Sequence, residues 1–163
     1  FALVLTAEDL SAQWIATVLF VVVLATDGID GHIARSRGLI TDLGKLLDPI
    51  ADKLVTNGVL VCLSLQGALP WWVTIPIVVR EVGITVWRLI EVRRGNVVPA
   101  NAGGKLKTIT QSVAITLALA PFPALLGGWV NGVNTVVMAI AFVLTIWSGL
   151  SYLVAASKMR QSR

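Results

Sequence analysis

Long apolar stretches with few or no charges dominate this sequence, and they limit the folds it can adopt more than any other feature. Apolar residues make up 56% of the 163-residue chain and charged residues only 13%. A water-soluble domain of this size cannot hide so much apolar surface, but segments of this length can cross a bilayer as helices. The stretches are Ser11–Ala25, Leu54–Leu65, Trp71–Trp87, Ile109–Leu126 and Val133–Ala156.

The stretches lack the strict apolar–polar alternation of membrane strands, so we expect an all-α fold: a polytopic bundle of six transmembrane helices. The sequence contains no internal repeat and no linker, which predicts a single domain over residues 1–163. The run Phe1–Leu5 is too short to span a bilayer and is interpreted as the remainder of a truncated first helix. The other helices are expected near Ala12–Arg35, Gly44–Leu65, Trp71–Arg94, Lys105–Leu126 and Val133–Ser157.

The cations occur only at alternate connections between these helices, and this predicts an orientation. Cytoplasmic loops collect Lys and Arg, whereas tryptophans favour the membrane interface. The connections at Gln66–Pro70 and Gly127–Gly132 carry no cation and adjoin Trp71, Trp72 and Trp129, so we place them outside. The cytoplasmic set is Arg35, Arg37, Lys45, Lys53, Arg93, Arg94, Lys105, Lys107, Lys158, Arg160 and Arg163.

The net charge of +4 and the pI near 9.7 do not indicate nucleic-acid binding. The cations are mostly confined to one membrane face, and no aromatic residues are interleaved with them there. Anionic membrane lipids and phosphorylated substrates are the expected partners instead.

Acidic residues concentrate where the second and third expected helices meet the cytoplasm. Five of the nine acids lie within Asp27–Asp52. Asp27 and Asp30 are three residues apart and Asp48 and Asp52 four apart, so each pair shares a helix face if both segments are helical. Four carboxylates in contact would repel one another without a cation, and hard oxygen ligands suit Mg²⁺ or Mn²⁺. The spacing therefore predicts a divalent-metal site.

Small residues lie among these acids, at Gly28, Gly31, Ala34 and Gly44. They remove side-chain bulk and would let a nucleotide or a pyrophosphate approach the backbone. The alternative is that the glycines serve helix packing and the aspartates form a solvated loop.

The whole segment TDGIDGHIARSRGLITDLGKLLDPIADK resembles the CDP-alcohol phosphotransferase family. It matches the pattern D-x-x-D-G-x-x-A-R, eight residues, then G-x-x-x-D-x-x-x-D, and its LDPxADK extension is similar to a bacterial branch, the phosphatidylglycerophosphate synthases. The resemblance implies a phosphatidyltransferase of the bacterial inner membrane, with its active site on the cytoplasmic side, and it suggests a homodimer.

The resemblance also implies roles for individual residues. Asp27, Asp30 and Asp48 would bind one or two divalent cations that hold the pyrophosphate of CDP-diacylglycerol. Asp52 would be a further metal ligand and the general base, which takes the proton from the acceptor hydroxyl. The positions that would bind the CDP-lipid are Gly31, Ala34, Arg35 and Gly44.

The fourth expected helix carries charge deep in an apolar stretch. Arg80 lies eight residues beyond Trp72, or roughly 12 Å at the helical rise. Glu81 is not expected to share the face of its neighbour Arg80, but it aligns with Arg88, so charge should point into the bundle. The segments REVGITVWRLIE and GGKLKT resemble those that receive the phosphate of glycerol 3-phosphate in the synthases. The candidates for that role are Arg80, Arg88, Lys105 and Lys107.

Other interpretations remain open at this point. Arg80 and Glu81 could form structural buried pairs, with Lys105 and Lys107 as ordinary cytoplasmic flanks. Within the family, the acceptor could instead be inositol phosphate or phosphatidylglycerol. A divalent-cation transporter would also use membrane aspartates, but it should carry polar groups toward both faces, and the outer half has few.

Overall fold

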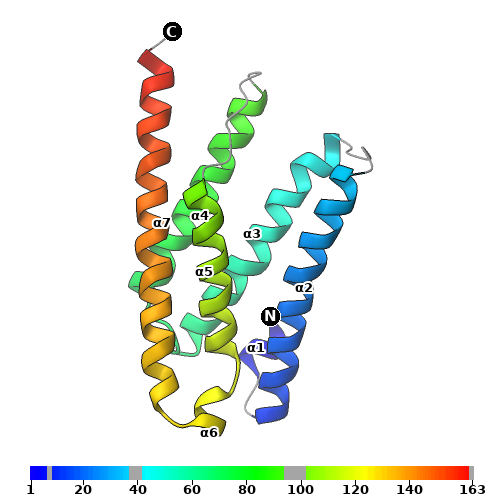
Figure 1. Ribbon diagram of the computed structural model, residues 1–163, viewed down its shortest axis with the longest axis vertical. Coiled ribbons are helices and arrows are strands. Elements are labelled where there is room, and N and C mark those ends of the chain that lie inside the picture. The colour runs from blue at the N-terminus through cyan, green and yellow to red at the C-terminus, as the bar shows by residue number, and fades with distance from the viewer. Residues whose placement is uncertain (7–8, 37–41, 94–101, 162–163) are drawn as a thin grey trace.

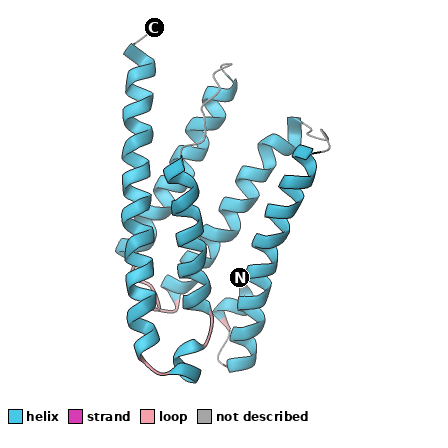
Figure 2. Cartoon of the chain, in the orientation of Figure 1, coloured by secondary structure: helices cyan, strands magenta, loops and turns pink. Residues whose placement is uncertain are grey.

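The computed structural model of the protein describes residues 1–6, 9–36, 42–93 and 102–161. All secondary structure in these residues is helical, as expected, and short loops join the helices (Figure 2). Two of the helices are short, α1 (Ala2–Leu5) and α6 (Phe122–Leu126). The long ones are α2 (Leu10–Ser36), α3 (Asp42–Leu65), α4 (Trp71–Arg93), α5 (Ala102–Leu119) and α7 (Trp129–Gln161).

The fifth expected helix ends earlier than predicted, and this is the largest difference in helix boundaries. We expected it to continue to Leu126, but α5 stops at Leu119 and the separate turn α6 follows. The reason is the pair of prolines, because Pro121 caps α6 and Pro123 lies in its first turn, where a missing N–H is tolerated. Gly127, with φ of 96°, then ends α6 and lets α7 begin four residues before the predicted Val133.

The long helices alternate in direction, so their ends gather at two opposite ends of the bundle (Figure 1). One end, here called the motif end, holds the last residues of α2, α4 and α7 and the first residues of α3 and α5. The other, the turn end, holds the opposite termini and the connections at Gln66–Pro70 and Gly127–Gly128. The cation-rich segments of the sequence therefore lie toward the same end of the fold.

Packing is tightest between α5 and α7, and α4 lies against both α3 and α7. Fully buried Leu60, Ile77, Ile115 and Ala141 bring four helices into one core. The outward faces are also apolar, for example at Trp147, which is 72% exposed, and at Leu153. The bundle thus carries apolar side chains on its outside as well as in its interior.

One segment in the described part of the chain is long and apolar enough to cross a membrane by length and composition alone, Trp129–Val154 of α7. Shorter apolar helical segments cover Leu10–Thr26 and Lys53–Leu65. In α4, Arg80 and Glu81 interrupt another apolar stretch. These two residues form the core of the site described next.

Candidate active site

The two halves of the aspartate motif lie at the motif end, on consecutive antiparallel helices (Figure 1). Asp27 and Asp30 are in the second half of α2, whereas Asp48 and Asp52 are in the first half of α3. Both segments are helical, which meets the condition under which each pair shares a helix face. The side chains of residues 27–52 lie outside the described ones. The predicted roles of these aspartates, and of Gly31, Ala34, Arg35 and Gly44, therefore stay predictions.

The described side chains contain no group of three or more His, Cys, Asp or Glu residues that could hold a metal ion. The four aspartates of the motif remain the donor set predicted from the sequence. Carboxylate oxygens are the ligands that Mg²⁺ and Mn²⁺ prefer, so the chemistry of this set fits a hard divalent cation.

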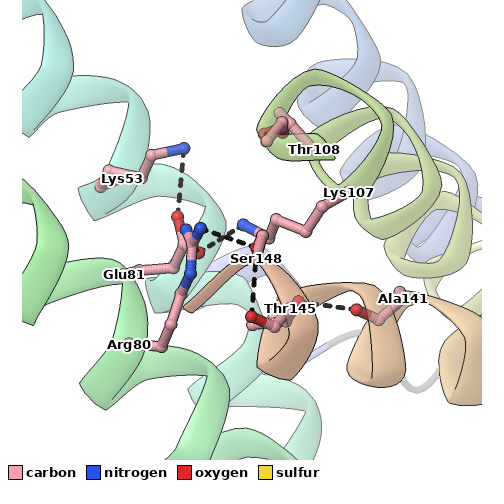
Figure 3. A network of polar contacts seen from close by, with 9 residues as sticks. Lys53, Arg80, Glu81, Lys107, Thr108, Ala141, Thr145 and Ser148 are labelled. Atoms are coloured by element: carbon pink, nitrogen blue, oxygen red, sulfur yellow. Dashed lines mark hydrogen bonds and ion pairs between the residues drawn. The ribbon is translucent and has the colours of Figure 1, made fainter. Parts of the chain in front are cut away.

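A buried ionic cluster begins one residue beyond the last aspartate of the motif (Figure 3). At its centre is Glu81 of α4, which is only 2% exposed. Its Oε1 accepts hydrogen bonds from Arg80 Nη1 at 2.8 Å and from Lys107 Nζ of α5. Its Oε2 lies 3.3 Å from Nζ of Lys53 in α3. One carboxylate therefore binds three cations from three helices.

Arg80 connects this cluster to a fourth helix. Its Nη2 donates a hydrogen bond of 2.7 Å to Ser148 Oγ of α7, and its guanidinium lies 5.7 Å from the centre of the Tyr152 ring. A Cβ added to Gly149 would approach Arg80 Cγ to 3.1 Å, so the missing side chain lets the arginine pass close to α7. Cation–π contact and close packing thus hold the arginine in place.

The cations of the cluster share one acid. Glu81 is one acid shared by Arg80 and Lys107, and Lys53 adds a further contact to it. Lys107 is almost fully buried and Arg80 largely so. In addition, the buried Nε of Arg80 has no hydrogen-bond partner among the described residues. Two buried cations on a single buried carboxylate suit an additional anionic ligand.

A second polar layer lies one turn further from the motif end. Asn57 follows Lys53 by four residues on α3, and Gln111 follows Lys107 by four residues on α5, so each pair shares a helix face. Both side chains are buried, and neither amide atom of Gln111 has a partner in the described part of the molecule. The polar part of the interior therefore continues past the ion pairs of Glu81, away from the motif end.

The sequence-based expectation for Arg80 and Glu81 was wrong in one respect. These neighbours were expected to face apart, but the long arginine side chain curls round the helix and binds Glu81 directly. Arg88, expected to point inward with Glu81, is exposed. It lies about 10 Å further along α4, toward the motif end.

The two lysines of α5 differ in the same way. Lys107 is buried on Glu81, whereas Lys105 is exposed, because residues two apart on a helix point in nearly opposite directions. Sequence reasoning did not single out Lys53 or Ser148 for this site. Lys53 could have been found as the last residue of LDPxADK, directly after Asp52, but Ser148 has no sequence signal.

The chain belongs to the CDP-alcohol phosphatidyltransferase family, a family of membrane-associated transferases, whose family model matches residues 1–147. Enzymes of this family are generally dependent on a divalent metal. The chain is 45% identical over 146 residues to a probable phosphatidylglycerophosphate synthase of Mycobacterium tuberculosis, which covers 90% of this chain and 68% of that protein.

Two further relatives carry the name CDP-diacylglycerol–glycerol-3-phosphate 3-phosphatidyltransferase. The Bacillus subtilis protein is 36% identical over 148 residues, with 85% of this chain and 77% of the relative covered. The Shigella flexneri protein is 34% identical over 161 residues, with 96% of this chain and 86% of the relative covered.

Proposed function

We propose that this enzyme transfers the phosphatidyl group of CDP-diacylglycerol to a hydroxyl of glycerol 3-phosphate, releasing CMP and forming phosphatidylglycerophosphate. The observation that carries the proposal is the buried cluster around Glu81, in which three cations gather on one carboxylate beside the aspartate motif. The names of the relatives from Mycobacterium, Bacillus and Shigella support the same reaction.

Asp27, Asp30, Asp48 and Asp52 would hold one or two divalent cations, Mg²⁺ or Mn²⁺. When bound, such an ion supplies neutralisation of negative charge on the transferring phosphoryl group. Gly31, Ala34, Arg35 and Gly44 would bind the CDP-lipid, with the small residues leaving room for the cytidine nucleotide and the arginine offering a donor to phosphate.

Asp52 acts as the general base in this proposal. The acceptor oxygen forms a bond to the phosphorus that carries diacylglycerol, and its proton passes to the Asp52 carboxylate. The bond from that phosphorus to the bridging oxygen breaks, and CMP leaves with the electron pair. Asp52 is adjacent to Lys53, so the base and the ionic cluster follow one another on α3.

The acceptor phosphate would bind to the cations of α4 and α5. Arg80 and Lys107 belong to the buried cluster, whereas Arg88 and Lys105 are exposed and would meet the phosphate from the cytoplasmic side. A guanidinium suits two-point binding of phosphate, and an ammonium adds a compact charge. A binding site made of these cations favours a phosphorylated acceptor over a neutral alcohol. Inositol phosphate and phosphatidylglycerol remain the alternative acceptors.

We further propose that residues 1–163 form one domain in a bacterial cell membrane, spanning it several times in a six-helix bundle that includes a first helix. The apolar outer faces support contact with lipid acyl chains. The concentration of cations toward the motif end supports a cytoplasmic active site. A homodimer is part of the same proposal.

The test is to incubate the purified protein in detergent or nanodiscs with CDP-diacylglycerol and follow CMP release. Glycerol 3-phosphate, inositol phosphate and phosphatidylglycerol are offered separately, with Mg²⁺ or Mn²⁺ and then with EDTA. We expect release with glycerol 3-phosphate, its loss with EDTA, and recovery when metal is returned in excess. No release with any acceptor would overturn the enzymatic assignment, and release with another acceptor alone would change the substrate.

Arg88 gives a narrower test of the acceptor pocket. Replacing this exposed arginine by alanine should raise the KM for glycerol 3-phosphate about threefold to tenfold and leave kcat nearly unchanged, because it removes one phosphate contact. Initial rates at varied acceptor concentration measure this. Unchanged acceptor dependence would mean that the pocket does not extend to Arg88.

A further inference from the structure

The feature left unexplained by the proposed function is the acid at the centre of the cation cluster. An acceptor phosphate would be repelled by Glu81, yet this carboxylate is buried among the three cations and binds all of them. Its two oxygens are divided between the partners, with Arg80 and Lys107 on Oε1 and Lys53 on Oε2. A residue that only repelled the substrate would have no reason to be here.

We propose that Glu81 is a positioning residue that sets the geometry of the acceptor-phosphate pocket, with Lys53 as a member of that pocket. The inference rests on the proposed function and deepens it. Glu81 holds cations from α3, α4 and α5 in one layer. A phosphate monoester carries roughly −1.5 to −2 at neutral pH, so it is attracted to this layer.

The geometry favours positioning over simple charge balance. Lysine and arginine side chains have many rotamers, and three like charges in a buried space would spread apart without a common anchor. Glu81 offers that anchor from the middle of α4, and Ser148 of α7 fixes the other end of the Arg80 guanidinium. The cations are thus arranged before the phosphate arrives, which lowers the entropic cost of binding.

The two roles predict opposite results for Glu81→Gln. If Glu81 acted through its charge alone, the substitution would remove a negative charge from the site and strengthen phosphate binding. If it acts by positioning, the KM for glycerol 3-phosphate should rise about tenfold or more, with kcat and the KM for CDP-diacylglycerol changing less than about threefold. Glu81→Asp keeps the charge on a shorter side chain and should recover part of the lost affinity.

A second readout isolates the phosphate from the rest of the acceptor. Inorganic phosphate should inhibit the wild type competitively against glycerol 3-phosphate, and its inhibition constant should rise in Glu81→Gln in parallel with the KM. The control is Asp9→Asn, which removes an exposed acidic charge just before the start of α2, at the turn end. Its KM and inhibition constant should stay within about twofold of wild type.

A merely structural role would lower the thermal stability of Glu81→Gln without changing the KM or the phosphate inhibition constant, and that result would overturn the inference. A lower KM would also overturn it, in favour of charge alone. If the wild type released no CMP, the proposed function would fail. The inference would then be decided by whether phosphate raises the melting temperature of the wild type and not of Glu81→Gln.

Discussion

The interior of this bundle is built differently toward its two ends. Around Glu81, buried ion pairs join α3, α4 and α5, and a hydrogen bond from Arg80 to Ser148 adds α7. Toward the turn end, buried polar groups form neutral hydrogen bonds instead, such as the 2.6 Å bond between Ser64 Oγ and Thr74 Oγ1. A cavity of about 170 Å³ lies there, lined by Val4, Gln13, Ala16, Leu63, Gln66, Ala68, Ala118 and Leu119.

This difference separates a part of the molecule that does chemistry from a part that holds it together. Buried ions are costly to desolvate, and replacing them by apolar side chains is often neutral or stabilising. Their presence beside the motif therefore indicates a functional requirement. The neutral hydrogen bonds and the cavity toward the turn end require no such explanation. Substitutions near the motif should change kinetics, whereas those near the cavity should change only stability.

The largest effect is expected at the proposed base. Asp52→Asn keeps the shape of the side chain but removes its ability to accept a proton, so turnover should fall by about 10³-fold or more. Binding of CDP-diacylglycerol, measured by fluorescence with a labelled lipid, should remain, because three further aspartates of the motif are unchanged. Turnover within tenfold of wild type would assign the base to another residue.

A matched pair of lysine substitutions on α5 tests whether a buried lysine contributes more to acceptor binding and stability than an exposed one. Lys107→Met removes a buried partner of Glu81, and should raise the KM for glycerol 3-phosphate by at least about tenfold and lower the free energy of unfolding by about 2 kcal/mol. Lys105→Met removes an exposed lysine two residues away. It should raise the KM only about twofold to fivefold and leave stability unchanged. Initial rates measure the KM of both variants, and denaturant unfolding in micelles measures their free energy of unfolding. Equal effects of the two substitutions would mean that burial does not determine how much a lysine contributes.

Gln111 lies between the ionic part of the interior around Glu81 and the neutral part toward the turn end. Its amide is buried with no partner among the described residues, so Gln111→Leu should remove an uncompensated polar group and raise the free energy of unfolding by about 1 kcal/mol. Thermal unfolding with and without glycerol 3-phosphate checks this. A loss of stability together with a raised KM would instead show that the amide binds water or substrate and belongs to the site.

The smallest effect is expected at the cavity. Ala118→Leu adds apolar volume to the space near the turn end, and should raise stability by up to about 1 kcal/mol if the cavity accepts the side chain. All kinetic constants should stay within about twofold of wild type. A change in the KM for either substrate would mean that the two ends of the bundle are coupled, contrary to the separation described above.

Much of the fold could be predicted because it depends on local patterns. Apolar stretches of helical length located α2, α3 and α4 to within a few residues, and the prolines and glycines near Gly127 indicated a turn. The break between α5 and α6 was missed because Pro121 and Pro123 can either end one helix or begin the next. Both occur here, because Pro121 follows the end of α5 and caps α6, and the first turn of α6 contains Pro123.

By itself, the sequence determined the helical class, the direction of the helices and the spacing of the aspartate motif, since all three follow from helix periodicity and the distribution of charge. Only the tertiary structure decided which charges meet. Lys53, Glu81 and Lys107 are far apart in the chain, and their contact depends on how α3, α4 and α5 cross. For the same reason, the sequence predicted that Arg80 faces away from Glu81. In the structure, the arginine side chain is long enough to bend round the helix to Glu81, and its contact with α7 holds it there.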